Sequence, residues 1–144
     1  VFDLKHSEGV ITNLSLSLPG KHNIENAIAA SAVALLSGVT EEGIKDAITS
    51  FTGVKRRFEI SGDFNETIYI DDYAHHPTEI LKVLEAGREL YPTKRLSVIF
   101  QPHLYTRTRD FEDEFAEALS GFDEVVLLDI YPARELPIQG VTSE

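Results

Sequence analysis

The 144-residue chain contains no cysteine, no methionine and no tryptophan. Without cysteine it can form neither disulfides nor thiolate metal sites, which fits a reducing cytoplasm. It also lacks a long uncharged apolar run, so the sequence predicts no transmembrane helix and no membrane partner. Its first residues show no secretory signal. Because the chain has no initiator methionine, we expect a segment of a longer or engineered protein.

Basic residues are scarce. The chain has 13 Lys and Arg against 24 Asp and Glu, which gives a formal net charge of −11. A field of that sign repels nucleic-acid phosphates, so no nucleic-acid partner is expected. The apolar fraction of 42% is ordinary for a globular protein. Arginines that cluster against such an acidic background need a local reason.

The first third of the chain predicts strands followed by helices: a hairpin over 1–18, a helix over 23–36 and a helix over 40–51. The hairpin is expected to turn near residues 7–9. Asn23 and Thr40 are the expected N-caps of the two helices, and Gly38 is expected to close the first. The helical pattern ends at residues 52–54, which suggests a domain boundary near 53–56.

The rest of the chain alternates strands and helices. A second hairpin is expected over 58–70, folded at residues 62–63. The second strand of this hairpin, at 67–70, is followed by strands at 96–100 and 124–128, with helices at 77–90 and 109–119 between the three strands. Strands that alternate with helices pair in parallel through right-handed crossovers. The predicted fold class is therefore α/β with a mainly parallel sheet.

Two polar segments, residues 70–77 and 100–109, each follow an apolar strand and precede a helix. Loops of this kind gather at the carboxyl edge of an open α/β sheet, where such sheets bind ligands. The two segments should therefore place eight polar side chains along one edge: Asp71, Asp72, His75, His76, His103, Tyr105, Arg107 and Arg109. Such a concentration indicates a ligand site.

Each of these side chains has a functional and a structural interpretation. Asp72 can accept the hydroxyls of a nucleotide ribose, or it can cap the next helix. His75 and His76, beside the aspartates, can ligate a metal or contact phosphate and substrate oxygens. Arg107 and Arg109 suit a phosphate or carboxylate. Because Arg109 can simply pair along its helix, Arg107 is the stronger candidate.

Other signals are weaker. Asn26 lies near the start of the first helix and can hydrogen-bond a base edge. Residues 55–57 form either a solvated linker or an anion contact. Residues 131–135 follow the last strand at the same edge, but their chemistry is unspecific. The chain contains no phosphate-binding P-loop and no nucleophile elbow.

Taken together, residues 20–27, 57–59, 71–79, 100–109 and 128–133 resemble the Mur ligases of peptidoglycan synthesis, in order and over nearly the whole chain. The resemblance implies a three-domain enzyme in which a Rossmann-like C-terminal domain closes over a UDP-sugar domain and an ATP-binding domain. Residues 1–54 would then be the end of the central ATPase domain. Residues 55–144 would be the C-terminal domain, truncated at its end.

The resemblance also implies a reaction. ATP and Mg²⁺ would activate the carboxylate of UDP-N-acetylmuramate as an acyl phosphate, which the amine of L-alanine attacks in the cytoplasm. Carried over by position, the nucleotide-binding residues would be His22, Asn23, Asn26, Arg57 and Asp72. The catalytic residues would be His75 and Arg107, and the substrate-binding residues His76, His103 and Tyr105. No metal ligand is assigned to this chain.

Two departures from the family pattern matter. The N-terminal domain and most of the central domain, with its P-loop and magnesium ligands, are missing, so we expect the chain alone to be inactive and to bind ATP poorly. Leu104 stands where many relatives carry an arginine, which either removes one substrate contact or shifts its work to Arg107. Three alternatives stay open: a related ligase that attaches peptide to UDP-N-acetylmuramate in wall recycling, a metal-dependent hydrolase, and a regulatory nucleotide-binding module.

Overall fold

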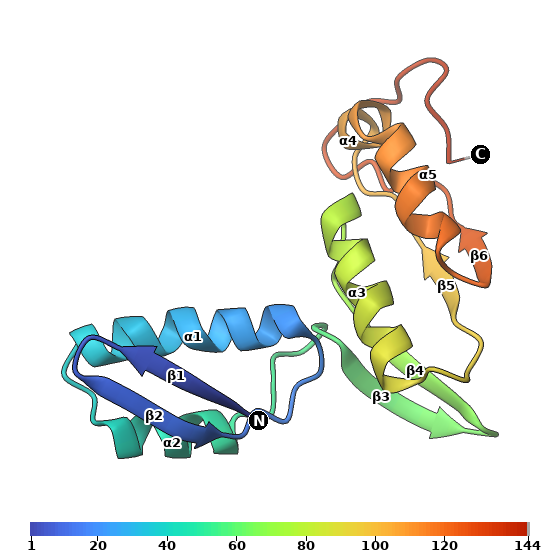
Figure 1. Cartoon of the computed structure of the whole chain (residues 1–144). Helices are drawn as coiled ribbons and strands as arrows, with labels where there is room; N and C mark the ends of the chain where they lie inside the picture. Colours follow the sequence, from blue (N-terminus) through green and yellow to red (C-terminus); the bar gives the residue numbers. More distant parts are fainter. Residues whose placement is uncertain (144) are drawn as a thin grey trace. The chain divides into compact units, whose positions relative to one another are not determined.

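The computed structural model describes residues 1–143, which form two compact units that divide between Asp71 and Asp72 (Figure 1). The division falls after the second hairpin, whereas the predicted domain boundary at residues 53–56 falls before it. No helix within residues 1–143 combines the length and the apolar composition needed to cross a bilayer.

The first unit begins with a β-hairpin and two helices. Strands β1 (Phe2–His6) and β2 (Gly9–Leu14) pair antiparallel, and the His6–Gly9 pair confirms the expected turn. Helices α1 (Lys21–Leu36) and α2 (Glu41–Ser50) run along this hairpin (Figure 1). The buried apolar side chains between them are Leu4, Ile11, Leu14, Ile44 and Ile48.

The helix caps match the predictions except at one residue. Thr40 is the N-cap of α2, because its hydroxyl accepts a hydrogen bond of 3.1 Å from the Gly43 amide. Gly38 follows the end of α1 with a φ of 82°. The prediction for Asn23 was wrong: α1 begins at Lys21, after Gly20 turns the chain with a φ of 89°. The Asn23 amide group instead donates to the Pro19 carbonyl at 2.6 Å.

A second hairpin closes the first unit. Strands β3 (Glu59–Phe64) and β4 (Thr67–Asp71) pair antiparallel. The predicted turn at residues 62–63 was wrong, because the chain turns at Asn65 and Glu66, which have φ values of 50° and 63°. Two positive φ values in a two-residue loop match the twist of the flanking strands. Gly62 instead lies at a shift in register, where the strand bulges.

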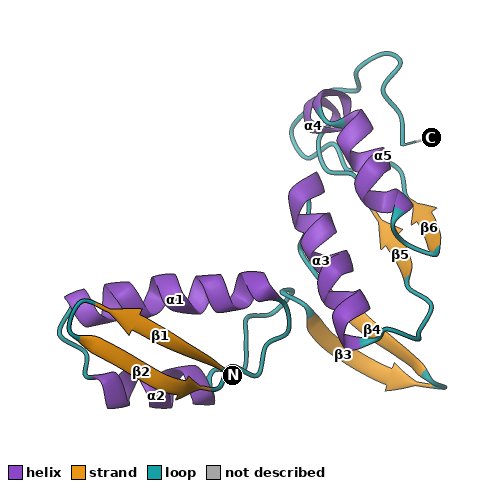
Figure 2. Cartoon of the chain, viewed as in Figure 1, coloured by secondary structure: helices purple, strands orange, loops and turns teal. Residues whose placement is uncertain are grey.

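The second unit alternates helices and strands (Figure 2). In chain order it contains α3 (Pro77–Leu90), β5 (Ser97–Phe100), α4 (Tyr105–Asp110), α5 (Glu112–Ser120) and β6 (Glu124–Leu127). The prediction of a single helix over 109–119 was wrong. Phe111, with φ −127° and ψ 27°, leaves the helical region and separates α4 from α5.

The predicted α/β class is confirmed, and β5 and β6 pair in parallel as expected. Strand β4, however, pairs only with β3 among the described residues, which form three two-stranded sheets rather than one continuous sheet. A two-residue turn gives β4 a local partner at little loop-closure cost. In the second unit, side chains of α3, β5 and α5 pack into one core: Ile80, Phe100, Phe115, Ala118 and Leu119.

Candidate functional site

The polar segments that follow β5 and β6 lie side by side. His103 and Tyr131 form an isolated parallel bridge beyond the ends of the two strands. The Leu104 amide donates to the Tyr131 carbonyl at 2.9 Å, and the Tyr131 amide donates to the Pro102 carbonyl at 2.8 Å. The rings of His103 and Tyr131 stack with centroids 5.5 Å apart. The carboxyl ends of this strand pair therefore carry the second of the two polar segments, whereas the first follows β4, which belongs to a different sheet.

Arg107 lies one helical turn beyond His103. Its Nη1 is 3.4 Å from His103 Nδ1, and both side chains are half-buried. Because a guanidinium only donates, Nδ1 accepts and the proton of the neutral ring lies on Nε2. Arg109 differs: it is exposed and contacts the Asp110 carboxylate at 2.7 and 2.8 Å, which is the local pairing considered above. Tyr105, also half-buried, begins α4.

His75 and His76 lie at the start of α3, where Glu79 holds the backbone of both. Glu79 Oε2 accepts hydrogen bonds from the amides of His75 at 2.9 Å and His76 at 3.3 Å. His76 is the N-cap of α3, and its ring accepts from the Thr78 amide. This reciprocal arrangement is a capping box. Both histidines therefore have defined backbone positions before any ligand binds.

Their ring nitrogens face different partners. His75 Nδ1 lies 2.9 Å from the Tyr73 carbonyl oxygen, which can only accept, so the proton lies on Nδ1. His76 Nδ1 accepts from the Thr78 amide, so the proton of the neutral ring lies on Nε2. In their neutral forms, His75 offers a lone pair on Nε2 and His76 offers a donor. Adjacent rings of this kind can hold a substrate and accept a proton from it.

Phe111 connects the two polar segments. The His76 ring meets the Phe111 ring edge to face, with centroids 4.7 Å apart. The Phe111 amide donates to the Arg107 carbonyl at 3.1 Å. The start of α3 therefore meets the end of α4, and His76 belongs to the same neighbourhood as Arg107 and His103.

The acidic candidates have structural partners. Asp72 is half-buried, and its Oδ1 accepts from the Ala74 amide at 2.7 Å, which stabilises the turn that leads to His75. The cap of α3 is His76, so Asp72 does not take the capping role considered for it. Asp71 pairs with Arg56 at 3.5 Å, and both are exposed.

The remaining nucleotide candidates lie in the first unit. His22, Asn23 and Asn26 occupy the first two turns of α1, and Asn26 is exposed. Arg57 is exposed ahead of β3, where its amide donates to the Val54 carbonyl at 3.2 Å. Asp72, by contrast, begins the second unit.

Metal ions need several converging ligands. Within residues 1–143, no group of three or more His, Asp or Glu side chains is arranged to hold one. The hydrolase interpretation, which requires the aspartates and histidines of the two polar segments to converge, gains no geometric support.

Sequence reasoning missed Glu135, in a segment that looked unspecific. Its carboxylate accepts from the Thr106 hydroxyl at 2.5 Å and from the Thr106 amide at 2.9 Å. Hydrogen bonds from the Thr106 side chain and amide, helped by the charge of Arg109, lower the pKa of Glu135 below its usual value. Glu79 was also missed, although an acid three residues after a cap is a recognisable signal.

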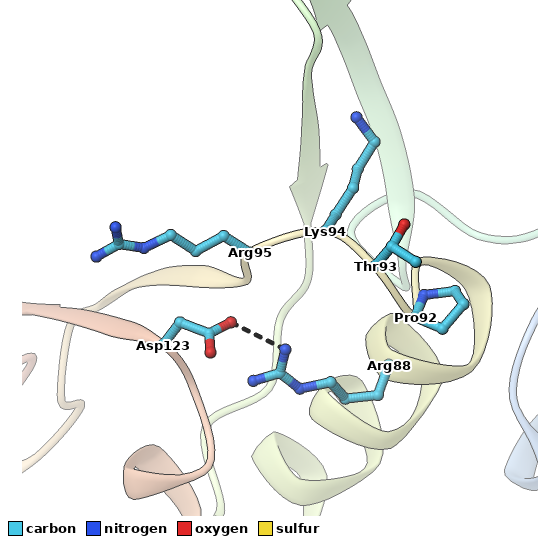
Figure 3. Close-up of a pocket in the computed structure, with 6 residues that line it drawn as sticks. All are labelled: Arg88, Pro92, Thr93, Lys94, Arg95 and Asp123. Carbon is cyan, nitrogen blue, oxygen red and sulfur yellow. Dashed lines mark hydrogen bonds and ion pairs between the residues drawn. The ribbon is translucent and has the colours of Figure 1, made fainter.

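A shallow depression lies at the other end of the strand pair (Figure 3). Its lining residues are Arg88, Pro92, Thr93, Lys94, Arg95 and Asp123. Asp123 accepts from Arg88 at 2.9 Å and from the Leu96 amide at 2.8 Å, and Arg88 also donates to the Gly121 carbonyl. These bonds tie the end of α3 to the segments that enter β5 and β6, which is a structural role.

Comparison with known proteins places this arrangement in a family. Residues 56–143 match the family model described as Mur ligase, glutamate ligase domain. The chain belongs to the Mur ligase family. The match contains β3, β4 and the two polar segments, whereas His22, Asn23 and Asn26 lie outside it.

Individual Mur ligases are similar over most of the chain. The UDP-N-acetylmuramate–L-alanine ligase of Flavobacterium johnsoniae is 53% identical over 144 residues, which are 100% of this chain and 32% of the relative. The crystal structure of UDP-N-acetylmuramate-alanine ligase from Thermotoga maritima matches with a TM-score of 0.69 and 39% identity, covering 82% of this chain and 26% of that one. A murein peptide ligase from Psychrobacter arcticus matches with a TM-score of 0.55 and 26% identity, over 80% of this chain and 30% of that one. The chain therefore spans about a third of the length of the relatives it matches.

Proposed function

We propose that this chain is part of an ATP-dependent ligase that joins L-alanine to UDP-N-acetylmuramate in peptidoglycan synthesis. The observation that carries the proposal is the 53% identity, over every residue of the chain, to the Flavobacterium johnsoniae enzyme of that name. The clustering of His103, Arg107 and Tyr131 at one strand edge supports it. Residues 1–54 are assigned to the end of the central ATPase domain and residues 55–144 to the C-terminal domain.

The proposed chemistry follows from the polar edge. Arg107, held beside His103, stabilises the negative charge that develops as the muramoyl carboxylate becomes an acyl phosphate and is then attacked. His75 Nε2, with its lone pair, accepts a proton from the attacking amine. The substrate-binding residues are His76, His103 and Tyr105. The ring N–H groups of the two histidines suit the oxygen atoms of the sugar substrate.

Five residues of this chain are assigned to the nucleotide. His22, Asn23 and Asn26 are proposed to contact adenine, Arg57 a phosphate, and Asp72 the ribose hydroxyls. ATP supplies the phosphoryl group that activates the carboxylate. We assign no Mg²⁺ ligand to this chain, because the resemblance places these ligands mostly in the missing part of the central domain. The N-terminal and central domains of the same protein, in the cytoplasm, would complete the enzyme.

The 144-residue chain alone is proposed to be inactive and to bind ATP weakly, because it contains no P-loop to hold the triphosphate. Isothermal titration calorimetry of the isolated chain should show no micromolar affinity for ATP. Micromolar binding would mean that adenine and ribose contacts suffice without the phosphate site, and the assignment of the missing domains would fail.

The decisive experiment uses the full-length protein. Phosphate release from ATP should require UDP-N-acetylmuramate and L-alanine together. A preference for a preformed tripeptide over L-alanine would identify the wall-recycling ligase instead. Hydrolysis without ATP, accompanied by a tightly held transition metal in elemental analysis, would identify a hydrolase. Nucleotide binding without any turnover would identify a regulatory nucleotide-binding module.

A further inference from the structure

Helix α4 cannot hold its own position. It has only six residues, and an isolated helix of that length is unstable in water. Its N-cap residue is Leu104, whose side chain cannot accept a hydrogen bond from the helix, and no side-chain cap comes from within the segment. Yet α4 carries Arg107 and begins two residues after His103. Something outside the helix must therefore fix these two side chains.

Glu135 supplies the missing cap from 29 residues away. One carboxylate oxygen accepts from the Thr106 amide at 2.9 Å and the other accepts from the Thr106 hydroxyl at 2.5 Å. A carboxylate that bonds to the first turn satisfies an amide that has no partner within the helix and faces the positive end of the helix dipole. Both bonds end on one residue, so they fix the rotation of the helix as well as its position.

The backbone of residues 131–135 holds the Glu135 carboxylate next to α4. The Glu135 amide donates to the Pro132 carbonyl at 2.9 Å, and Ala133 adopts a φ of 50°, so residues 132–135 form a tight turn. Just before it, Tyr131 exchanges backbone hydrogen bonds with Pro102 and Leu104. The start of α4 is thus held twice, by backbone bonds to Tyr131 and by the side chain of Glu135.

We infer that Glu135 is a positioning residue for the transfer reaction: its carboxylate, bonded to Thr106, sets the orientation of α4 and so places Arg107 and His103 against the sugar substrate. The inference rests on the proposed function, because it requires those two side chains to face the substrate. Glu135 itself touches neither of them; it acts through the helix. Loss of its bonds should therefore affect the reaction of the sugar substrate and leave nucleotide binding unchanged.

The test compares three single variants and one double variant of the full-length protein with a matched control. Glu135→Ala removes both bonds. Glu135→Gln keeps both, since its amide oxygen can accept from the Thr106 amide and its NH₂ can donate to the Thr106 hydroxyl. Thr106→Val removes only the hydroxyl bond. Glu117→Ala, at an exposed position of α5, removes a carboxylate of the same unit that plays no part in the site.

Glu135→Ala is expected to lower kcat/KM for UDP-N-acetylmuramate by about tenfold to a hundredfold, the loss that a displacement of about 1 Å typically causes. The KM for ATP should stay within about twofold. Glu135→Gln should recover most of the loss, and Glu117→Ala should match the wild type. Thr106→Val should cost less than Glu135→Ala, and the double variant E135A/T106V should be no worse than Glu135→Ala alone.

Two results would overturn the inference. One is wild-type kcat/KM for the sugar substrate in Glu135→Ala. The other is an equal loss for sugar and ATP that Glu135→Gln fails to recover, which would describe a cap that only stabilises the fold. If Glu135→Ala does not fold, Thr106→Val decides, because it keeps the amide bond to α4: it should still lower kcat/KM for the sugar substrate, and wild-type kcat/KM would overturn the inference. Failure of the proposed function is separate, since it would appear as a wild-type protein that does not use L-alanine.

Discussion

The rings of His103 and Tyr131 stack 5.5 Å apart with an angle of 21° between their planes, although 28 residues separate them in the sequence. Backbone hydrogen bonds on both sides of Tyr131 hold the two segments in the parallel register that β5 and β6 begin. The stack leaves His103 Nδ1 next to Arg107. Tyr131 therefore limits how far the imidazole can turn.

This relationship predicts a graded effect at Tyr131 in the full-length protein. Tyr131→Ala removes the ring and should lower kcat/KM for the sugar substrate by about twofold to tenfold, as expected for an aromatic pair worth about 0.5–1.5 kcal/mol. Tyr131→Phe keeps the ring and should match the wild type. Equal kinetics for the Ala and Phe variants would show that the stack does not constrain His103.

Asp72 and Arg107 should affect different substrates. Asp72→Ala should raise the KM for ATP, because a ribose contact is made in the ground state and the transition state alike. The loss of one charged hydrogen-bond partner typically costs about 1.5–3 kcal/mol, or roughly tenfold to a hundredfold. Arg107→Ala should instead lower kcat or weaken binding of the sugar substrate. Steady-state kinetics with each substrate varied separately will distinguish the two.

Conservative variants separate chemistry from folding at the same positions. Asp72→Asn keeps an oxygen for the Ala74 amide, so it preserves the turn while removing the charge. Arg107→Lys keeps the positive charge but replaces the planar guanidinium with an ammonium group. If the Ala variants of both residues retain wild-type kcat and KM, the assignment of these residues to ligands is wrong.

Asp123 predicts a pH dependence at the other end of the strand pair. The hydrogen bond from Arg88 is the largest cause that lowers the Asp123 pKa below 3.8, and the Leu96 amide and the charge of Arg95 add to it. A carboxyl group with a lowered folded pKa stabilises the fold fully above its unfolded pKa. This stabilisation is lost as the pH falls below about 3.8 and through the folded pKa.

The measurement is amide hydrogen exchange at Leu96, whose amide donates directly to Asp123. Protection of this amide in the wild type, relative to Asp123→Asn, should be constant above about pH 4 and should shrink below it. Asp113→Asn, at an exposed position of α5, should leave that protection unchanged. A wild-type advantage that persists unchanged at pH 2 would contradict the predicted direction.

Local patterns predicted most of the elements and part of the site. The spacing of apolar residues placed α2 and α3, and the order of strands and helices predicted the parallel β5–β6 pair. His103 and Arg107 were predicted to share an edge because both follow the same strand. These features depend on residues that are close in sequence, where periodicity and turn chemistry carry the information.

The rest depends on contacts or backbone angles that no local pattern encodes. Glu135 reaches α4 from a segment whose composition indicated only a loop. The second hairpin turns at Asn65 and Glu66, although Gly62 offered the stronger turn signal, because the pairing of Phe64 with Thr67 fixes the register. The break at Phe111 interrupts a regular helical pattern. A long-range hydrogen bond decides the first of these features, and backbone angles at single residues decide the other two.

Leu104 offers a test of backbone strain beside the site. Its φ of 76° with ψ of 132° lies where glycine is comfortable and other residues are rare. The backbone bond from its amide to Tyr131 holds it there. Both Leu104→Gly and Leu104→Ala remove the leucine side chain, but only glycine adopts this backbone conformation without strain. The free energy of unfolding should therefore be about 1 kcal/mol higher for Leu104→Gly than for Leu104→Ala, even though glycine gives the unfolded chain more freedom.

The control for Leu104 is the same pair of substitutions at Glu117, an exposed position inside α5. There the order should invert, with Glu117→Gly less stable than Glu117→Ala by about 1 kcal/mol, because glycine is a poor helix former. For the two Leu104 variants, the local measurement is hydrogen exchange at the Thr108 amide, which donates to the Leu104 carbonyl at 3.1 Å. The same order at both positions would mean that Leu104 is not held at positive φ, and that α4 joins β5 by an ordinary extended residue.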